Sequence, residues 1–204
     1  MNNKINFSAV LKIVAILCIF LLVSSFARQA EFPEPKVIDG KVTEISYAKI
    51  ALIDDKSEEQ SFYLSEDTRV YKLIPKGTEE LKQNIYLSIS GKVDDKSIDA
   101  EMIGIWSEVN SEIMGDMLYD MGAEALERFA GGKICQIKSI APLTIEDLKA
   151  EKFSVKVTPK TEIYEILTGE ISDIKKDDTV NLRVFDLSEM GIGNFFMISV
   201  LKKE

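Results

Sequence analysis

Gly40-Lys41-Val42-Thr43-Glu44-Ile45 has a counterpart later in the chain, Gly132-Lys133-Ile134-Cys135-Gln136-Ile137. A similar tetrapeptide follows each segment, Thr68-Arg69-Val70-Tyr71 after the first and Thr161-Glu162-Ile163-Tyr164 after the second. From glycine to threonine is 28 positions in one copy, 40 to 68, and 29 in the other, 132 to 161. Similar segments at nearly the same spacing are typical of a duplicated structural unit. We therefore expect two related domains.

Both copies consist of short β-strand patterns separated by turn residues. Residues 153–157 alternate between apolar and polar positions, and residues 85–93 form a longer strand pattern. Asp-Asp-Lys-Ser occurs at 54–57 and again at 94–97, each time between two such patterns. These acidic tetrapeptides lack the dense aspartate spacing and central glycine of a calcium loop, so we expect hairpin turns. In the second copy, residues 146–152 predict a longer acidic loop or a helical turn.

Between the copies, over residues 107–131, the apolar residues change to a spacing of three or four positions. Residues so spaced share one face of a helix. They are Met114, Met117, Leu118, Met121, Ala125 and Phe129. Asn110 or Ser111 would cap the start of this helix, and Gly131-Gly132 its end. We expect one amphipathic helix whose apolar face packs on a neighbouring domain, with a methionine-rich docking groove as the alternative.

Residues 1–27 have the pattern of a secretory signal peptide. Lysines at positions 4 and 12 accompany an unbroken apolar run over 13–23, and small residues follow at Ser25 and Ala27. If the segment is not cleaved, residues 7–27 would form a hydrophobic helix that anchors the protein in the membrane. In either case we expect the rest of the chain to be extracytoplasmic. Residues 28–35 predict an extended linker, because paired prolines disfavour a helix.

Composition excludes several classes of function. The 204 residues include no histidine, which removes the commonest general base and a usual metal ligand. A net charge of −9 repels phosphate backbones, so nucleic acid is not an expected partner. The two cysteines are Cys18 and Cys135, and we expect Cys135 to be a small buried hydrophobe, with a reactive thiol as the alternative. The sequence indicates no catalytic, cofactor-binding or metal-binding residue.

Each copy also resembles a module of exported bacterial proteins, a group of uncharacterised, OB-like small β-barrels. Its typical order is a Gly-x-Val strand, a hairpin, a Thr-x-[Ile/Val] strand and a long strand closed by glycine. The first copy matches at Gly40, Thr68, Gly91, Ala100 and Ile103. The second copy matches at Gly132 and Thr161, and no glycine closes its strand over 180–185. The resemblance implies a fold and an envelope location, and it implies no activity.

These patterns predict a mainly β protein. We expect two tandem small OB-like β-barrel or sandwich domains, joined by an α-helix and preceded by the N-terminal hydrophobic helix. The first barrel would span 36–106, the connecting helix 107–131 and the second barrel 132–204.

With no histidine and no polar cluster at catalytic spacing, we expect a non-enzymatic, exported binding or scaffolding protein attached to the membrane or cell envelope. Its partner would be an envelope protein or a wall polymer, because small barrels bind oligosaccharides and peptides on one face. Tyrosines are the candidate sugar-stacking residues: Tyr47, Tyr63, Tyr71, Tyr86 and Tyr164. The alternatives are a cation-binding envelope protein and a hydrolase that uses paired carboxylates. No cofactor is expected.

Overall fold

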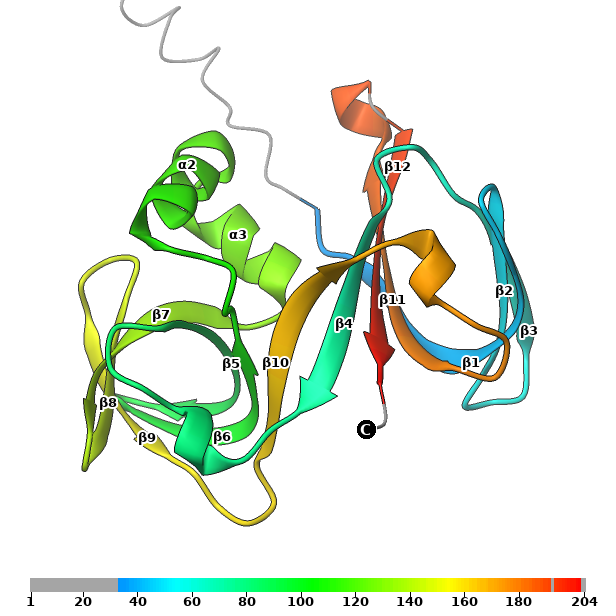
Figure 1. Cartoon of the computed structure of the whole chain (residues 1–204). Helices are drawn as coiled ribbons and strands as arrows, with labels where there is room; N and C mark the ends of the chain where they lie inside the picture. Colours follow the sequence, from blue (N-terminus) through cyan, green and yellow to red (C-terminus); the bar gives the residue numbers. More distant parts are fainter. Residues whose placement is uncertain (1–32, 192, 203–204) are drawn as a thin grey trace, which may run out of the picture. The chain divides into compact units, whose positions relative to one another are not determined.

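The structure is a computed structural model that describes residues 33–191 and 193–202 (Figure 1). The predicted signal peptide or anchor, residues 1–27, lies outside the described residues, as does most of the predicted linker. The described residues belong to one compact unit. Within them, no helix combines the length and the apolar character that crossing a membrane requires.

The fold is mainly β, as predicted. Strands and short helices alternate with turns close to the positions that the sequence patterns indicate. The strands are β1 (Lys36–Ser46), β2 (Lys49–Asp54), β3 (Glu59–Tyr63), β4 (Arg69–Pro75), β5 (Tyr86–Asp94), β6 (Ser97–Ile105), β7 (Lys133–Ile140), β8 (Leu143–Asp147), β9 (Lys152–Lys156), β10 (Glu162–Gly169), β11 (Thr179–Leu187) and β12 (Gly193–Leu201). Both Asp-Asp-Lys-Ser tetrapeptides form turns between strands, which confirms that prediction.

Strands β5 to β9 form a closed five-stranded barrel (Figure 1). Antiparallel pairs run in the order β6-β5-β7-β8-β9, and a parallel pairing of β6 with β9 closes the ring. The inward positions carry apolar side chains: Leu87, Ile89, Ile98, Ile103, Ile105, Cys135, Ile137, Ile145, Phe153 and Val155. Cys135 is fully buried, as expected, and this burial raises the pKa of its thiol.

The other strands form an open sheet in the order β3-β2-β1-β11-β12-β4. This sheet repeats the pairing of the closed barrel, with β1-β2-β3 in the place of β7-β8-β9 and β11-β12 in the place of β5-β6. Among the described residues, however, no pairing joins β3 to β12. The open sheet curves around a core of its own, which includes Ile38, Val42, Ile50, Leu52, Leu182, Phe196 and Ile198.

Each of these two bodies takes strands from both copies of the duplication. The closed barrel combines β5 and β6, from residues 36–106, with β7 to β9, from residues 132–204. The open sheet combines β1 to β3 from the first range with β11 and β12 from the second. The last hairpin of each copy is therefore exchanged. The structure thus differs from the predicted tandem arrangement. The exchange is possible because the two copies have similar pairing edges, so that each can complete its strand order with the hairpin of the other.

Strands β4 and β10 connect the two bodies and lie at an approximate two-fold axis. They pair antiparallel with Leu73 opposite Ile166, and Tyr71 and Tyr164 each precede one of these central residues by two positions. Strand β12 runs parallel to β4 on one side, just as β6 runs parallel to β10 on the other. The β4–β10 pair is thus the common centre of both copies.

Backbone hydrogen bonds show how the two copies correspond. Val42 exchanges two backbone hydrogen bonds with residues 177–178, of 2.8 and 2.9 Å. Ile137 makes the equivalent pair with residues 84–85, of 2.9 and 3.2 Å. Val42 therefore corresponds to Ile137. The match between the two glycine-led segments had instead paired Val42 with Ile134, three positions earlier.

An aspartate closes the same hairpin in both copies. Asp54 Oδ1 accepts hydrogen bonds from the backbone amides two and four residues later, at 2.9 Å each. Asp147 Oδ1 accepts the same pair, at 2.9 and 2.8 Å. The two connections are equally long, since β3 begins five positions after Asp54 and β9 five positions after Asp147. The prediction of a longer loop over 146–152 is therefore wrong.

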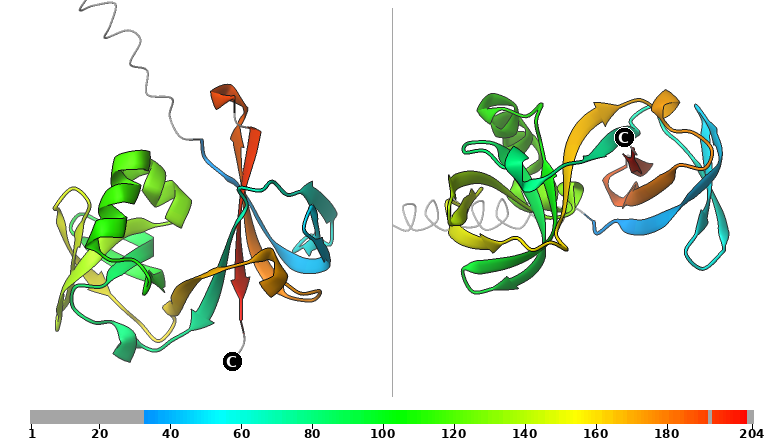
Figure 2. Two further views of the ribbon diagram at one scale, coloured as in Figure 1. Left: turned by 45° about the horizontal axis from the view of Figure 1, so that its top comes forward. Right: turned by 60° about the horizontal axis from the view of Figure 1, so that its bottom comes forward.

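Two helices occupy the connector, where the sequence predicted one. Helix α2 (Ser111–Met121) starts at Asn110, whose side chain accepts two backbone hydrogen bonds as a cap, and α3 (Ala123–Ala130) ends at Gly131. Gly122, with φ of 76°, separates them. The helices lie outside the barrel in both views of Figure 2. Among the side chains of these helices that the structure describes, Met114, Ala125, Leu126 and Ala130 are buried.

Gly91 lies where β5 shifts register against β6. Its φ is 153°, and a Cβ there would overlap the carbonyl oxygen of Asp99. We expect Gly91→Ala to destabilise the protein by about 2 kcal/mol, because it combines backbone strain with a steric overlap. The matched control is Gly115→Ala in α2, where no atom lies within 4 Å of the added Cβ. That change should stabilise by roughly 0.5 kcal/mol. Thermal unfolding measures both, and equal effects would contradict the role of Gly91.

Asp147 also forms a partly buried ion pair. Its Oδ2 accepts a hydrogen bond from Lys133 Nζ at 2.8 Å, and that ammonium lies 4.9 Å from the Phe153 ring centroid. Burial opposes ionisation of the carboxyl, but the hydrogen bonds from Lys133 and from the loop amides outweigh it and keep the pKa of Asp147 below its ordinary value of 3.8.

We expect Asp147→Asn to destabilise the protein by roughly 2 kcal/mol at neutral pH, because it removes the nearer of the two carboxylates that pair with Lys133 and leaves Glu127 at 3.7 Å. A folded-state pKa below the unfolded value makes this contribution complete above about pH 4, and it is lost as the pH falls through the folded pKa. Urea unfolding of variant and wild type along a pH series should therefore show curves that converge in acid. Asp55→Asn, in the exposed turn of the first copy, is the control. A difference that stays constant in acid would contradict this assignment.

Candidate functional site

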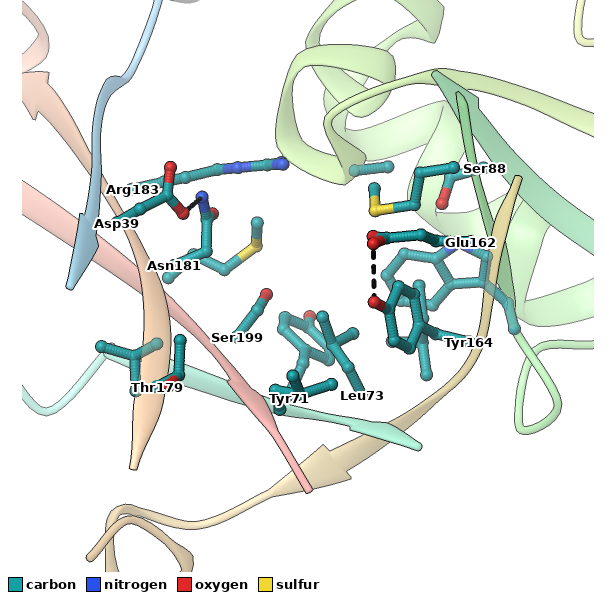
Figure 3. Close-up of a pocket in the computed structure, with 17 residues that line it drawn as sticks. Asp39, Tyr71, Leu73, Ser88, Glu162, Tyr164, Thr179, Asn181, Arg183 and Ser199 are labelled. Atoms are coloured by element: carbon teal, nitrogen blue, oxygen red, sulfur yellow. Dashed lines mark hydrogen bonds between the residues drawn. The ribbon is translucent and has the colours of Figure 1, made fainter. Parts of the chain in front are cut away.

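A pocket of about 240 Å³ lies beside the β4–β10 pair, between the closed barrel and the open sheet (Figure 3). Its floor consists of Tyr71 and Leu73 from β4 and of Tyr164 and Ile166 from β10. These four side chains share one face of the pair, because Leu73 is opposite Ile166 and residues two apart in a strand point to the same side. The floor is therefore built around the approximate two-fold axis.

The exchanged hairpins form the walls of the pocket. The β5–β6 side contributes Ser88 and Met102, together with Trp106 directly after β6. The β11–β12 side contributes Thr179, Val180, Asn181, Arg183, Met197, Ser199 and Leu201. Each wall thus belongs to a different copy of the duplicated unit. The pocket depends on the exchange, which brings the two hairpins to face each other across β4 and β10.

The inner part of the pocket is apolar and aromatic. The rings of Tyr71 and Trp106 meet edge to face, with centroids 5.6 Å apart and an interplanar angle of 78°. Ile166 and Met197 are buried beside them in the same core cluster. An edge-to-face aromatic corner favours a flat or short apolar group against it.

Arg183 and two polar neighbours form one side of the pocket opening (Figure 3). Asn181 Nδ2 donates a hydrogen bond to Asp39 Oδ1 at 2.7 Å. The guanidinium of Arg183 lies over Gly131, in the space that a Cβ on this residue would fill. Burial lowers the pKa of Arg183 from its ordinary value, and the charge of Asp39 opposes this shift. Because Gly131 ends α3, the cation also lies near the negative end of the helix dipole.

Glu162 and Tyr164 form the opposite side (Figure 3). The hydroxyl of Tyr164 donates a hydrogen bond to Glu162 Oε2 at 3.0 Å. Burial, together with this hydrogen bond and the charge of Glu162, raises the pKa of Tyr164. Two carboxylates, those of Asp39 and Glu162, therefore line the pocket from opposite sides.

In the β5–β6 wall, two buried polar atoms have no hydrogen-bond partner among the described residues. They are Ser88 Oγ, in a residue that is 2% exposed, and Trp106 Nε1, in a residue that is 8% exposed. A buried donor that lacks a partner costs about 1–3 kcal/mol, so such groups in native proteins call for an explanation. A bound ligand that supplies a hydrogen-bond acceptor would be such an explanation.

Only part of the pocket could be expected from the sequence. Of the predicted tyrosines, Tyr71 and Tyr164 line it. Tyr86 is half-buried with its hydroxyl 3.3 Å from Ser111 Oγ, while Tyr47 and Tyr63 are exposed outside it. Ser88 and Trp106 were not predicted from the sequence. The one available signal was the single tryptophan, which directly follows a predicted strand. Across the described residues, no three His, Cys, Asp or Glu side chains gather so as to hold a metal ion.

Comparisons of the chain with protein-family models, with curated proteins and with solved structures gave no match. Function is therefore inferred from the side chains of the pocket.

We expect Gly131→Ala to cost more stability than Gly122→Ala. Both glycines have positive φ, of 72° and 76°, but only at Gly131 does the added Cβ meet a neighbour, the guanidinium of Arg183. Strain at positive φ costs of order 1 kcal/mol in each variant, and displacing Arg183 should add about as much again at Gly131. Thermal unfolding measures the difference. In an Arg183→Ala background this difference should disappear, and its persistence would contradict the contact.

Proposed function

We propose that the protein is a non-enzymatic binding protein whose pocket beside β4 and β10 takes a small, mainly apolar molecule. The observation that carries this proposal is the pocket itself, which has an aromatic and aliphatic interior and a few convergent polar groups. Ligand sites in proteins are typically of this composition. The unpartnered buried atoms of Ser88 and Trp106 support it, because they provide hydrogen bonds that the protein does not use.

We further propose that the closed barrel is an OB-like module. Its strands follow the cyclic order β7-β8-β9-β6-β5, and five-stranded barrels of the OB class bind oligosaccharides and other ligands on one face. The pattern of residues 1–27 supports export, with the protein secreted or anchored at the cell membrane. The partner would then be an envelope component. A pocket of about 240 Å³ suits a small molecule or the end group of a wall polymer.

One observation favours the carboxylate hydrolase as a second candidate. Asp39 and Glu162 lie on opposite sides of the pocket, as the two carboxyls of a glycosidase do (Figure 3). A general acid of this chemistry needs an apolar setting. Both residues are exposed, and each carboxylate already accepts a hydrogen bond, from Asn181 and from Tyr164. Binding without turnover is therefore the better-supported function.

We expect Ser199→Phe to abolish ligand binding, because the larger side chain would fill the pocket from β12. The measurement is ligand-observed NMR of the full-length protein with a library of small aromatic and aliphatic compounds. Ser61→Phe, which adds the same ring at an exposed position of β3, is the matched control and should bind as the wild type does.

If no compound distinguishes the two variants, the pocket is not the binding site. Product release from a wall glycan that stops in Glu162→Gln would favour the hydrolase instead.

A further inference from the structure

We infer that the ligand of this pocket is an uncharged molecule with an apolar body and one acceptor oxygen, which takes hydrogen bonds from Trp106 Nε1–H and Ser88 Oγ–H. The inference rests on the proposed binding function and specifies the chemical class that the pocket would take.

The two donors belong to one surface of the β5–β6 hairpin. Ser88 is directly opposite Gly104, and Trp106 follows Gly104 by two positions, so all three face the same side. The absence of a side chain at Gly104 lets Ile166 of the pocket floor pack against this surface beside Ser88, because a Cβ at Gly104 would overlap Ile166 Cδ1 and lie 2.7 Å from Ser88 Oγ. An indole N–H can only donate, and a serine hydroxyl can donate as well. One acceptor oxygen on a ligand can therefore satisfy both groups.

The charges around the pocket disfavour a charged ligand. An anion would meet two carboxylates, Asp39 and Glu162, against the single guanidinium of Arg183, which lies over Gly131 at the end of α3. A cationic amine would be attracted by the carboxylates. However, an ammonium group only donates hydrogen bonds, so it could donate to Ser88 Oγ but would leave Trp106 Nε1–H without an acceptor. A neutral carbonyl or hydroxyl oxygen avoids both conflicts.

The apolar lining selects the rest of the molecule. The corner between Tyr71 and Trp106, with Leu73, Ile166 and Met197 around it, offers contact to a ring or a short hydrocarbon chain. Burying such a group contributes roughly 25 cal/mol for each Å² removed from water. The acceptor oxygen would then orient the molecule toward the hairpin.

The sequence contains one tryptophan, so the fluorescence of the full-length protein reports on Trp106 and thus on this pocket. Four probes of similar size separate the alternatives: benzamide, benzoate, benzylamine and toluene. We expect benzamide to change the emission saturably at the lowest concentration. The two charged probes should bind at least about tenfold more weakly. Toluene, which lacks an acceptor and so forms neither hydrogen bond, should bind about twenty-five-fold more weakly, as the loss of two net hydrogen bonds of about 1 kcal/mol each predicts.

Ser88→Ala is the key variant. It should weaken benzamide about fivefold and leave toluene unchanged, with no fall in Tm, because the hydroxyl has no partner in the protein. Ser90→Ala, two positions further along β5 and outside the pocket, is the matched control and should change neither probe.

The possible failures are distinguishable. If no probe gives a saturable change, the proposed binding function itself is overturned. If benzoate or benzylamine binds more tightly than benzamide, the pocket binds ligands but the inferred class is wrong. If toluene binds as tightly as benzamide, or if Ser88→Ala weakens both equally, the two donors do not contact the ligand.

Discussion

The antiparallel pairing of β4 with β10 is the interaction on which the rest of the structure depends. Leu73 and Ile166 face each other at its centre. From there β4 leads the chain into the closed barrel, while β10 leads it into the open sheet. Each copy therefore gives its last hairpin to the other, and the buried cluster between them unites residues of both, including Trp106, Ile166, Phe185 and Met197. The stability of one copy is thus inseparable from that of the other.

The exchange also explains why the pocket is asymmetric although its framework is nearly symmetric. Leu87 pairs with Ile105 as Val180 pairs with Val200, so Ser88 corresponds to Asn181 and Trp106 to Leu201. Asn181 on one wall donates a hydrogen bond to Asp39, whereas the hydroxyl of the corresponding Ser88 on the other wall has no partner among the described residues. The two copies therefore differ at facing positions, and on the β5–β6 wall Ser88 Oγ and Trp106 Nε1 have no partner among the described residues.

The sequence predicted what depends on local pattern and missed what depends on the choice of partner. Strand alternation and acidic turns placed the strands correctly, and Asn110 was foreseen as a cap. The hairpin β5–β6 has the same alternation whether it pairs with β1 or with β7, so the exchange leaves no local signal. The helix break was missed because the apolar spacing continues across Gly122. The correspondence of Asp147 with Asp54 was not predicted, because the sequence comparison paired Gly40 with Gly132 and so shifted the alignment of the two copies.

The location of the pocket has an energetic consequence for the whole fold. Its floor comes from β4 and β10, and its walls come from hairpins that belong to different copies. A ligand that fills it therefore contacts elements far apart in the sequence, all of which are in place only in the exchanged arrangement. Any molecule that binds the folded chain alone stabilises it by RT ln(1 + [L]/Kd). Here that free energy would act on the pairing of the two copies, so binding would reinforce the same β4–β10 centre that creates the site.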